Sequence, residues 1–230
     1  MAERKLIVHE QAKSPISEAY RTLRTNLQFS KIHDDLKLVM FTSSGPGEGK
    51  STTAANTAVA MAQAGKRVLL VDCDLRKPVQ HRIFGKKKDG LSNLIVESLS
   101  LDQVIQSTEV PGLSLLTSGP IPPNPSELLG SAKMDDFLAV AKERFDLVIL
   151  DASPVLAVTD ACVLASKVDG IALVIASGKV RPEIAAKAKD LLMKAKGHIL
   201  GVVLNRIEIE KEHAHYYYYY SADDKQKQGA

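Results

Sequence analysis

One glycine-rich segment limits the folds open to this chain more than any other part of its sequence. Residues 41–52 read FTSSGPGEGKST, between an apolar run at Leu38–Phe41 and a helix-forming run at Thr53–Ala64. A strand, a tight glycine-rich turn and a helix in this order are typical of a phosphate-binding loop, whose backbone N–H groups face phosphate oxygens. Ser44 stands where the usual pattern has its first glycine, so an ordinary glycine-rich turn is the alternative interpretation.

The loop pattern assigns a chemical task to each part of the segment. Lys50 is expected to reach the β- and γ-phosphates of a nucleotide, and the Ser51 hydroxyl is expected to bind Mg²⁺. The predicted nucleotide-contacting residues of the loop are Gly45, Pro46, Gly47, Glu48, Gly49, Lys50, Ser51 and Thr52.

Composition excludes several classes of protein. A net charge of +3 on 230 residues is too small to favour nucleic acid as a partner. The two cysteines, Cys73 and Cys162, suit a reducing cytosol rather than a disulfide scaffold. The charged start at 1–13 does not read as a signal peptide, and no apolar run approaches the ~18 residues of a membrane span. Any membrane association is therefore expected to come through a partner.

Strands and helices are expected to alternate along most of the chain. The expected strands lie at 38–41, 66–71, 113–117, 145–151, 170–176 and 198–204, and the expected helices at 53–64, 91–97, 101–106, 125–144, 158–167 and 181–196. This alternation predicts an α/β fold of the P-loop NTPase type, with a doubly wound, mostly parallel sheet and helices on both faces. We expect one domain over 1–207 and a flexible tail over 208–230.

Acidic residues follow two of the expected strands. Asp72 and Asp74 come after the strand at 66–71, and Asp151 ends the strand at 145–151. Ligands of parallel sheets bind beyond the carboxyl ends of the strands, which places these carboxylates near the phosphate loop. A strand-ending aspartate next to such a loop is expected to help hold Mg²⁺.

The segment 14–30 reads as an N-terminal helix after an irregular lead. Ser14 is the expected N-cap and Pro15 the first helical residue. An apolar stripe is expected at Ile16, Tyr20, Leu23 and Leu27. Three charged residues are expected to face outward, Glu18, Arg21 and Arg24; a solvated helix face is the simpler interpretation of this pattern.

The C-terminal segment holds the least ordinary feature of the sequence. Five consecutive tyrosines, Tyr216, Tyr217, Tyr218, Tyr219 and Tyr220, stand in a polar terminus, where a fold has no need of them. A β-prone adhesive segment, or weak metal binding with His213 and His215, is the alternative.

Together these features resemble the bacterial protein-tyrosine kinases of capsule and exopolysaccharide synthesis, in the form whose kinase is a separate cytoplasmic protein. The resemblance is carried by the phosphate loop, by Val71–Pro78, by Asp151, by the segment 116–129 and by the tyrosine tail. Two departures are visible: Ala152-Ser153-Pro154 stands where the family usually has Thr-Pro-Pro, and the tyrosines are contiguous rather than interspersed.

The resemblance implies roles for individual residues. Asp72 would be the general base for a tyrosine hydroxyl, although Asp74 could exchange roles with it. Asp74 and Asp151 would orient Mg²⁺ together with Ser51. Asn205 would contact adenine, the alternative being a strand-end turn residue. Tyr216–Tyr220 would be the phosphoacceptors.

The resemblance also implies an activity and its setting. The chain would use ATP and Mg²⁺ to phosphorylate its tail in trans, within a homo-oligomeric ring whose subunits meet through Glu18, Arg21 and Arg24. The cytoplasmic tail of a membrane-embedded activator would recruit it to the inner face of the membrane, and a phosphotyrosine phosphatase would oppose it.

Two other functions remain open at this point. The first is an ATPase switch of the chromosome-partitioning or division-site (ParA/MinD-like) type. Those proteins carry an extra lysine near the start of the loop, whereas Phe41–Glu48 contains none. The second is a nucleotide-binding scaffold without transfer activity, which the retained Lys50 and acidic residues disfavour.

Overall fold

The computed structural model describes residues 6–30 and 36–207 of the chain. The predicted tail at 208–230, and with it the five candidate phosphoacceptor tyrosines, lies outside the described residues.

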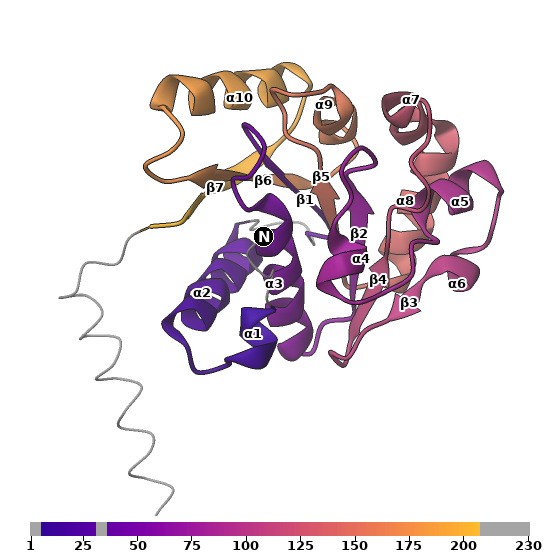
Figure 1. The fold of residues 1–230 in the computed structure, drawn as a ribbon, viewed down its shortest axis with the longest axis horizontal. Coiled ribbons are helices and arrows are strands. Elements are labelled where there is room, and N and C mark those ends of the chain that lie inside the picture. The colour runs from indigo at the N-terminus through magenta and orange to yellow at the C-terminus, as the bar shows by residue number, and fades with distance from the viewer. Residues whose placement is uncertain (1–5, 31–35, 208–230) are drawn as a thin grey trace, which may run out of the picture.

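A seven-stranded sheet forms the centre of the molecule (Figure 1). Its order is β3 (Gln106–Ser107), β4 (Leu113–Leu116), β2 (Val68–Cys73), β5 (Leu147–Ala152), β1 (Leu38–Ser43), β6 (Gly170–Ala176) and β7 (Ile199–Asn205). Every neighbouring pair is parallel except β3 with β4. The predicted doubly wound, mostly parallel sheet is therefore confirmed, with the short antiparallel β3 as an addition that the sequence did not indicate.

Helices cover both faces of the sheet (Figure 1). They are α1 (Ile7–Glu10), α2 (Pro15–Phe29), α3 (Lys50–Gln63), α4 (Gln80–Ile83), α5 (Leu91–Val96), α6 (Leu101–Val104), α7 (Pro125–Gly130), α8 (Ala132–Arg144), α9 (Asp160–Ala165) and α10 (Pro182–Lys194). Side chains alternate across a strand, so β1 feeds two separate cores. Leu38 and Met40 join the cluster that includes α8, α9 and α10, whereas Val39 and Phe41 join the cluster that includes α1, α2 and α3.

Two expected elements differ in the structure. The lead before α2 is not irregular, because α1 places Val8 in the core and the Val8 N–H donates to Asn56 Oδ1 of α3 at 3.1 Å. The helix expected over 125–144 is two helices, since Ser131 takes an extended backbone and its hydroxyl accepts from Met134 N, which starts α8. A local capping bond at Ser131 thus interrupts a helical pattern that is otherwise continuous.

Helix α2 begins as predicted, because the Ser14 hydroxyl accepts from Ser17 N and Pro15 is the first helical residue. The predicted apolar stripe is only partly right. Leu27 is buried, and Tyr20 and Leu23 are half-buried, but Ile16 is 49% exposed.

The outward charges of α2 also need a correction. Glu18 is exposed as expected and pairs with Arg21, but Arg21 is half-buried and its Nη2 also donates to the Ala12 carbonyl at 2.6 Å. Arg24 does not face outward: it is half-buried, and its Nη1 donates to the Ala60 carbonyl of α3 at 3.4 Å. The reason is that α2 lies along α3, so the contact between the two helices extends to the position of Arg24.

Helices within the described ranges are too short or too polar to cross a lipid bilayer.

Candidate active site

The predicted phosphate loop connects β1 to α3 at the carboxyl edge of the sheet, with Asp72 and Asp151 on the neighbouring strands β2 and β5. Gly47 and Gly49 have φ values of +77° and +98°, a left-handed conformation that glycine adopts without strain. At Gly49 the demand is also steric, because a Cβ atom there would lie 2.0 Å from Asn205 Nδ2. Lys50 and Ser51 are consequently placed at the first turn of α3.

A buried glutamate holds the loop from within. The Glu48 carboxylate accepts from the Ser44 hydroxyl, from the Gly45 N–H and, at 3.3 Å, from the Ala176 N–H of β6. Ser44 therefore has a structural use where the common loop pattern has glycine, since its hydroxyl satisfies one oxygen of a carboxylate that is only 4% exposed.

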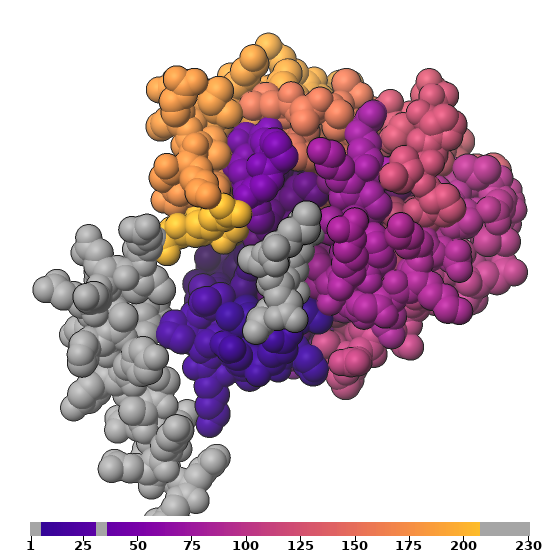
Figure 2. Space-filling view, in the orientation of Figure 1, coloured from indigo at the N-terminus to yellow at the C-terminus, as the bar shows by residue number. Residues whose placement is uncertain are grey.

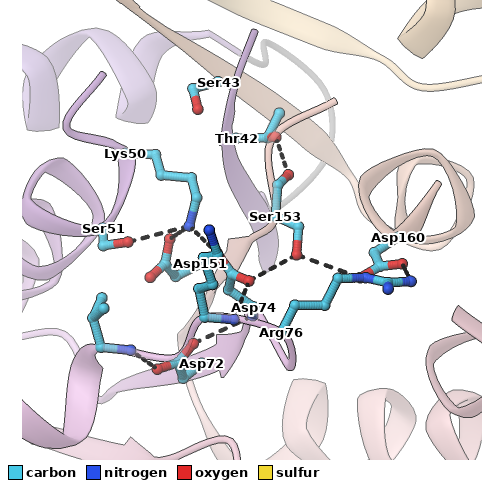
Figure 3. Close-up of polar contacts among 12 residues, drawn as sticks. Thr42, Ser43, Lys50, Ser51, Asp72, Asp74, Arg76, Asp151, Ser153 and Asp160 are labelled. Atoms are coloured by element: carbon cyan, nitrogen blue, oxygen red, sulfur yellow. Dashed lines mark hydrogen bonds and ion pairs between the residues drawn. The ribbon is translucent and has the colours of Figure 1, made fainter. Parts of the chain in front are cut away.

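Lys50 is the centre of the charged cluster (Figure 3). Its Nζ lies 2.9 Å from Asp74 Oδ2, 3.1 Å from Asp151 Oδ1 and 3.2 Å from Ser51 Oγ. Burial alone would lower the pKa of Lys50, but the carboxylates of Asp151 and Asp74 outweigh burial and raise the pKa above its usual value. The ammonium is therefore charged at neutral pH and sits among the oxygen atoms that the sequence assigned to Mg²⁺.

Asp72 is in the same cluster but faces the protein interior. It is fully buried, and its carboxylate accepts from the backbone N–H groups of Asp74, Val79 and Gln80 at 3.2, 2.9 and 2.9 Å. Burial and the nearby Asp151 carboxylate raise the pKa of Asp72 to about 7, against the opposing effect of these hydrogen bonds. Asp72 thus shapes the turn from β2 into α4.

Asp74 is the acidic residue that lines the cleft. Strand β2 ends at Cys73, so Asp74 lies in the turn rather than on the strand face that it would have shared with Asp72. Burial would raise the pKa of Asp74, but Lys50 and donors from Lys77 and Ser153 outweigh it and lower the pKa below its usual value. Asp74 is therefore an ionised carboxylate at neutral pH.

Gln80 is a member of the site that the sequence reading missed. Its side chain is fully buried, and its Nε2 donates to Asp151 Oδ2 at 2.8 Å and to the Ser51 carbonyl at 3.0 Å. Its Oε1 is buried without a hydrogen-bond partner in the described part of the chain. No sequence signal identifies Gln80, because it approaches Asp151 from 71 residues away.

The last strand clamps the outer side of the loop. Asn205 Nδ2 donates to the Glu48 carbonyl at 2.8 Å, and Arg206 Nη2 donates to the Gly47 carbonyl at 2.7 Å. In Figure 2 the yellow surface at the end of β7 adjoins the violet surface of the loop region. Asn205 Oδ1 accepts from Arg206 N, so both polar ends of the Asn205 amide already have partners within the chain.

A cleft of about 600 Å³ opens beside the cluster. It is lined by loop residues and by residues of the turns after β2, β5 and β7, including Pro46, Lys50, Ser51, Thr52, Asp74, Arg76, Lys77, Ser153 and Arg206. Lys50, Arg76, Lys77 and Arg206 give the cleft a cationic lining that suits an anionic ligand such as a nucleotide phosphate chain.

The donor set fits a magnesium ion that is held jointly with phosphate. Within residues 6–30 and 36–207, no group of three or more His, Cys, Asp or Glu side chains could hold a metal ion unaided. Mg²⁺ is commonly bound through one or two carboxylates together with water and substrate phosphates, which matches Asp74, Asp151 and the Ser51 hydroxyl around one point.

Comparisons with known proteins identify the family of the chain. A family model described as an AAA domain matches residues 36–178. The tyrosine-protein kinase YwqD of Bacillus subtilis is 47% identical over 210 residues, which cover 91% of this chain and 89% of that protein.

Solved structures extend the comparison. The crystal structure of the chimerical protein CapA2B2 superposes with a TM-score of 0.85 at 44% identity, covering 89% of this chain and 90% of the other. The cell division ATPase MinD of Pyrococcus furiosus superposes with a TM-score of 0.64 at 24% identity, over 76% of this chain and 74% of the other, and so shows the fold alone.

The identity to YwqD extends well beyond the loop, and the close structural likeness to CapA2B2 exceeds the likeness to the division ATPase. The rival interpretation as an ATPase switch is therefore the less supported one, and the chain belongs to the bacterial tyrosine-protein kinases.

Proposed function

We propose that this kinase uses Mg²⁺ and ATP to phosphorylate tyrosine hydroxyls, and that Tyr216–Tyr220 of a neighbouring copy are its acceptors. The observation that carries the proposal is the Lys50 ammonium, held between Asp74 and Asp151 at the mouth of the phosphate loop. Phosphoryl transfer requires placement and charge stabilisation more than covalent chemistry, and this cluster supplies both.

The residues of the site divide the work as follows. The backbone N–H groups of the loop Gly45–Thr52 bind the phosphates, and Lys50 leaves its two carboxylates to neutralise the transferred group. Ser51, Asp74 and Asp151 would hold Mg²⁺, which neutralises charge on the β- and γ-phosphates when bound. Asn205 is proposed to lie beside the adenine. Its side-chain amide donates one hydrogen bond and accepts one within the chain, so a second N–H and a second lone pair remain for the base.

The general base is proposed among the two acidic residues of the β2 turn. Asp72 has a pKa raised to about 7, which suits a base that works at neutral pH, but its oxygens are covered by the turn 74–80. Asp74 already lines the cleft. Asp72→Asn and Asp74→Asn, each assayed at saturating Mg²⁺ and ATP, separate the two: the base is the residue whose replacement lowers kcat more, because saturation compensates for a weakened magnesium site.

Assembly is proposed to bring a tail to a neighbour's cleft. Glu18 is exposed on α2 and is proposed to contact another subunit. Arg21 is half-buried and also donates to the Ala12 carbonyl at 2.6 Å, and Arg24 donates to the Ala60 carbonyl of α3, so each arginine would have to give up a bond within its own chain to reach a neighbour. Each phosphate adds about −1.5 to −2 charges, so a fully phosphorylated tail of five tyrosines gains roughly −8 to −10 and would drive a ring apart. Light scattering of Arg21→Ala and Arg24→Ala tests this, and unchanged mass in both refutes the α2 interface.

The physiological setting belongs to the same proposal. The kinase regulates capsule or exopolysaccharide synthesis and export. The cytoplasmic tail of a membrane-embedded partner activates it at the inner face of the membrane, and a phosphotyrosine phosphatase reverses the modification. The support is the family membership.

Phosphotyrosine mapping tests the activity itself. The full chain is incubated with Mg·ATP, with and without an activator tail, and its tyrosines are analysed by mass spectrometry. We expect phosphate on Tyr216–Tyr220, none on Lys50→Met, and transfer from the wild type to a Lys50→Met acceptor if the reaction runs in trans. ATP hydrolysis without any tyrosine phosphate, activator included, would favour an ATPase switch instead.

A further inference from the structure

Ser153 lies one residue beyond β5, at the position where the tyrosine-kinase pattern described above usually has proline. It is 1% exposed and lines the nucleotide cleft. Its backbone is fixed from the opposite side, because the Thr42 hydroxyl of β1 donates to the Ser153 carbonyl at 2.7 Å. The hydroxyl therefore projects from a rigid point toward the turn that carries Asp74.

The Ser153 hydroxyl stands between two carboxylates (Figure 3). Its Oγ lies 2.9 Å from Asp74 Oδ1 and 3.4 Å from Asp160 Oδ2. A hydroxyl has one hydrogen to donate, so it serves one acceptor at a time, and the shorter distance favours Asp74.

Asp160 does not depend on this hydrogen bond. It is fully buried, and Arg76 binds it with two N–H groups, Nε at 2.9 Å and Nη2 at 3.0 Å. A bidentate arginine pair of this kind satisfies a carboxylate strongly. The hydroxyl is thus available to Asp74, whose described partners, Lys50, Lys77 and Ser153, include no bidentate arginine.

Asp74 is held differently at its two oxygens. Oδ1 accepts from Ser153 Oγ and, at 3.0 Å, from the Lys77 N–H, whereas Oδ2 faces the Lys50 ammonium. Two donors converging on Oδ1 from different segments stop the carboxylate from rotating about its Cβ–Cγ bond.

We propose that Ser153 is a positioning residue that keeps Asp74 Oδ2 aimed at the Lys50 and Mg²⁺ side of the cleft. The inference rests on the proposed function, in which Lys50 leaves Asp74 for the phosphates and Asp74 orients Mg²⁺. Once the ammonium has left, the Ser153 and Lys77 donors are what keep Asp74 in place. Replacing the hydroxyl weakens the magnesium-dependent part of nucleotide binding and leaves the magnesium-free part unchanged.

The test is calorimetric binding of ADP to the full chain, with Mg²⁺ and again in EDTA, for the wild type and three variants. Ser153→Ala removes the hydroxyl, Ser153→Thr keeps it, and Ser118→Ala removes a buried serine outside the cleft as a matched control. The quantity compared is the dissociation constant of ADP in EDTA divided by that with Mg²⁺, which measures how much Mg²⁺ strengthens binding. Loss of one hydrogen bond predicts that this ratio falls about three- to tenfold in Ser153→Ala and stays unchanged in the other two variants. Urea unfolding of each unliganded variant confirms that the fold is kept, and the KM for Mg²⁺ should rise in Ser153→Ala more than kcat falls.

The outcomes separate this inference from the function on which it rests. A wild type that gains no ADP affinity from Mg²⁺ would overturn the proposed magnesium site and the role of Ser153 with it. A magnesium-responsive wild type with an unchanged ratio in Ser153→Ala overturns only the role of Ser153. An equal loss in Ser153→Ala and Ser153→Thr likewise rejects the hydroxyl as the cause.

Discussion

Ion pairs lie at both ends of the neighbouring strands β2 and β5, and they differ in burial although their distances are similar. At the amino ends, Arg67 and Asp146 pair at 2.8 Å with side chains 64% and 33% exposed. At the carboxyl ends, Lys50 pairs with Asp74 and Asp151 while all three side chains are at most 10% exposed. Similar chemical groups therefore lie in contact with water at one edge of the sheet and in the protein interior at the other.

The difference teaches where charge matters in this fold. An exposed pair gains little because water already solvates both partners and salt screens them. A buried pair has lost its water, so each charge depends on the others. The predictions below exploit this contrast, and they run from the largest expected effect to the smallest.

Replacing Lys50 should have the largest effect. In Lys50→Met two buried carboxylates lose their shared cation, and breaking a buried ion pair typically costs about 3–5 kcal/mol. We expect a loss of this size in the free energy of unfolding, measured by urea denaturation of the unliganded protein, together with loss of tyrosine phosphorylation. If Lys50→Met lowered the free energy of unfolding by no more than the loss of a surface pair does, water would have to enter the cluster, and the buried and exposed pairs would no longer differ.

Replacing Gln80 should have an intermediate effect. Gln80→Leu removes the donor to Asp151 Oδ2 and leaves that buried carboxylate partly unsatisfied, at a cost of about 1–3 kcal/mol in the free energy of unfolding. Because Asp151 would also lose its orientation, we expect kcat to fall more than the KM for ATP rises. Gln80→Glu is the more specific second variant, because it keeps the volume of the side chain nearly constant and places a second carboxylate against Asp151. Normal kinetics in both variants would exclude Gln80 from the site.

Acid should weaken the exposed pair of Arg67 and Asp146. Hydrogen bonds from Arg67 lower the pKa of Asp146 to about 2, and the bond from its side chain has a larger effect than the bond from its backbone N–H. A depressed carboxyl pKa adds stability above the unfolded value near 4 and loses it as pH falls from there through 2. Asp146→Asn should therefore be less sensitive than the wild type to acid between pH 4 and pH 2, measured as the thermal unfolding midpoint. Parallel pH curves would mean that the pair contributes nothing.

Salt gives the smallest expected effect. At 1 M ionic strength the screening length is about 3 Å, so the attraction between the exposed Arg67 and Asp146 side chains should nearly vanish. The stability difference between the wild type and Arg67→Ala should shrink toward zero in 1 M NaCl, whereas the difference between the wild type and Lys50→Met should persist. If salt changed the stability difference for Arg67→Ala and that for Lys50→Met equally, the Lys50 cluster could not be shielded from solvent.

Much of the fold could be predicted because its signals are local. The loop glycines, the apolar strands that end in aspartate and the Ser14-Pro15 helix start each depend on a few adjacent residues. The break at Ser131 is also local, but its single capping bond competes with a helical pattern on both sides. Arg24 was assigned to the wrong face because its position depends on how closely α2 approaches α3, which periodicity within α2 does not contain.

The site was predicted less completely because its geometry joins distant segments. Lys50, Asp72, Asp74 and Asp151 converge as expected, but the burial of Asp72 depends on a turn that folds back over it. Gln80 and Ser153 acquire their roles only by contact with acidic residues more than 70 residues away. Nothing in the local sequence marks Gln80, and Ser153 is visible in the sequence only as a departure from the family pattern, so their contacts with the acidic residues are known only from the folded structure.

The clamp of Asn205 and Arg206 on the phosphate loop has a consequence for the order of events in biosynthesis. The loop is made early in the chain, yet two of the bonds that fix its carbonyl groups come from the final strand. A nascent chain that has not yet released β7 from the ribosome already contains every glycine of the loop but lacks the groups that hold it in shape. A fragment ending before Ile199 carries the motif without these two bonds, and we expect it to bind nucleotide more weakly than the full chain.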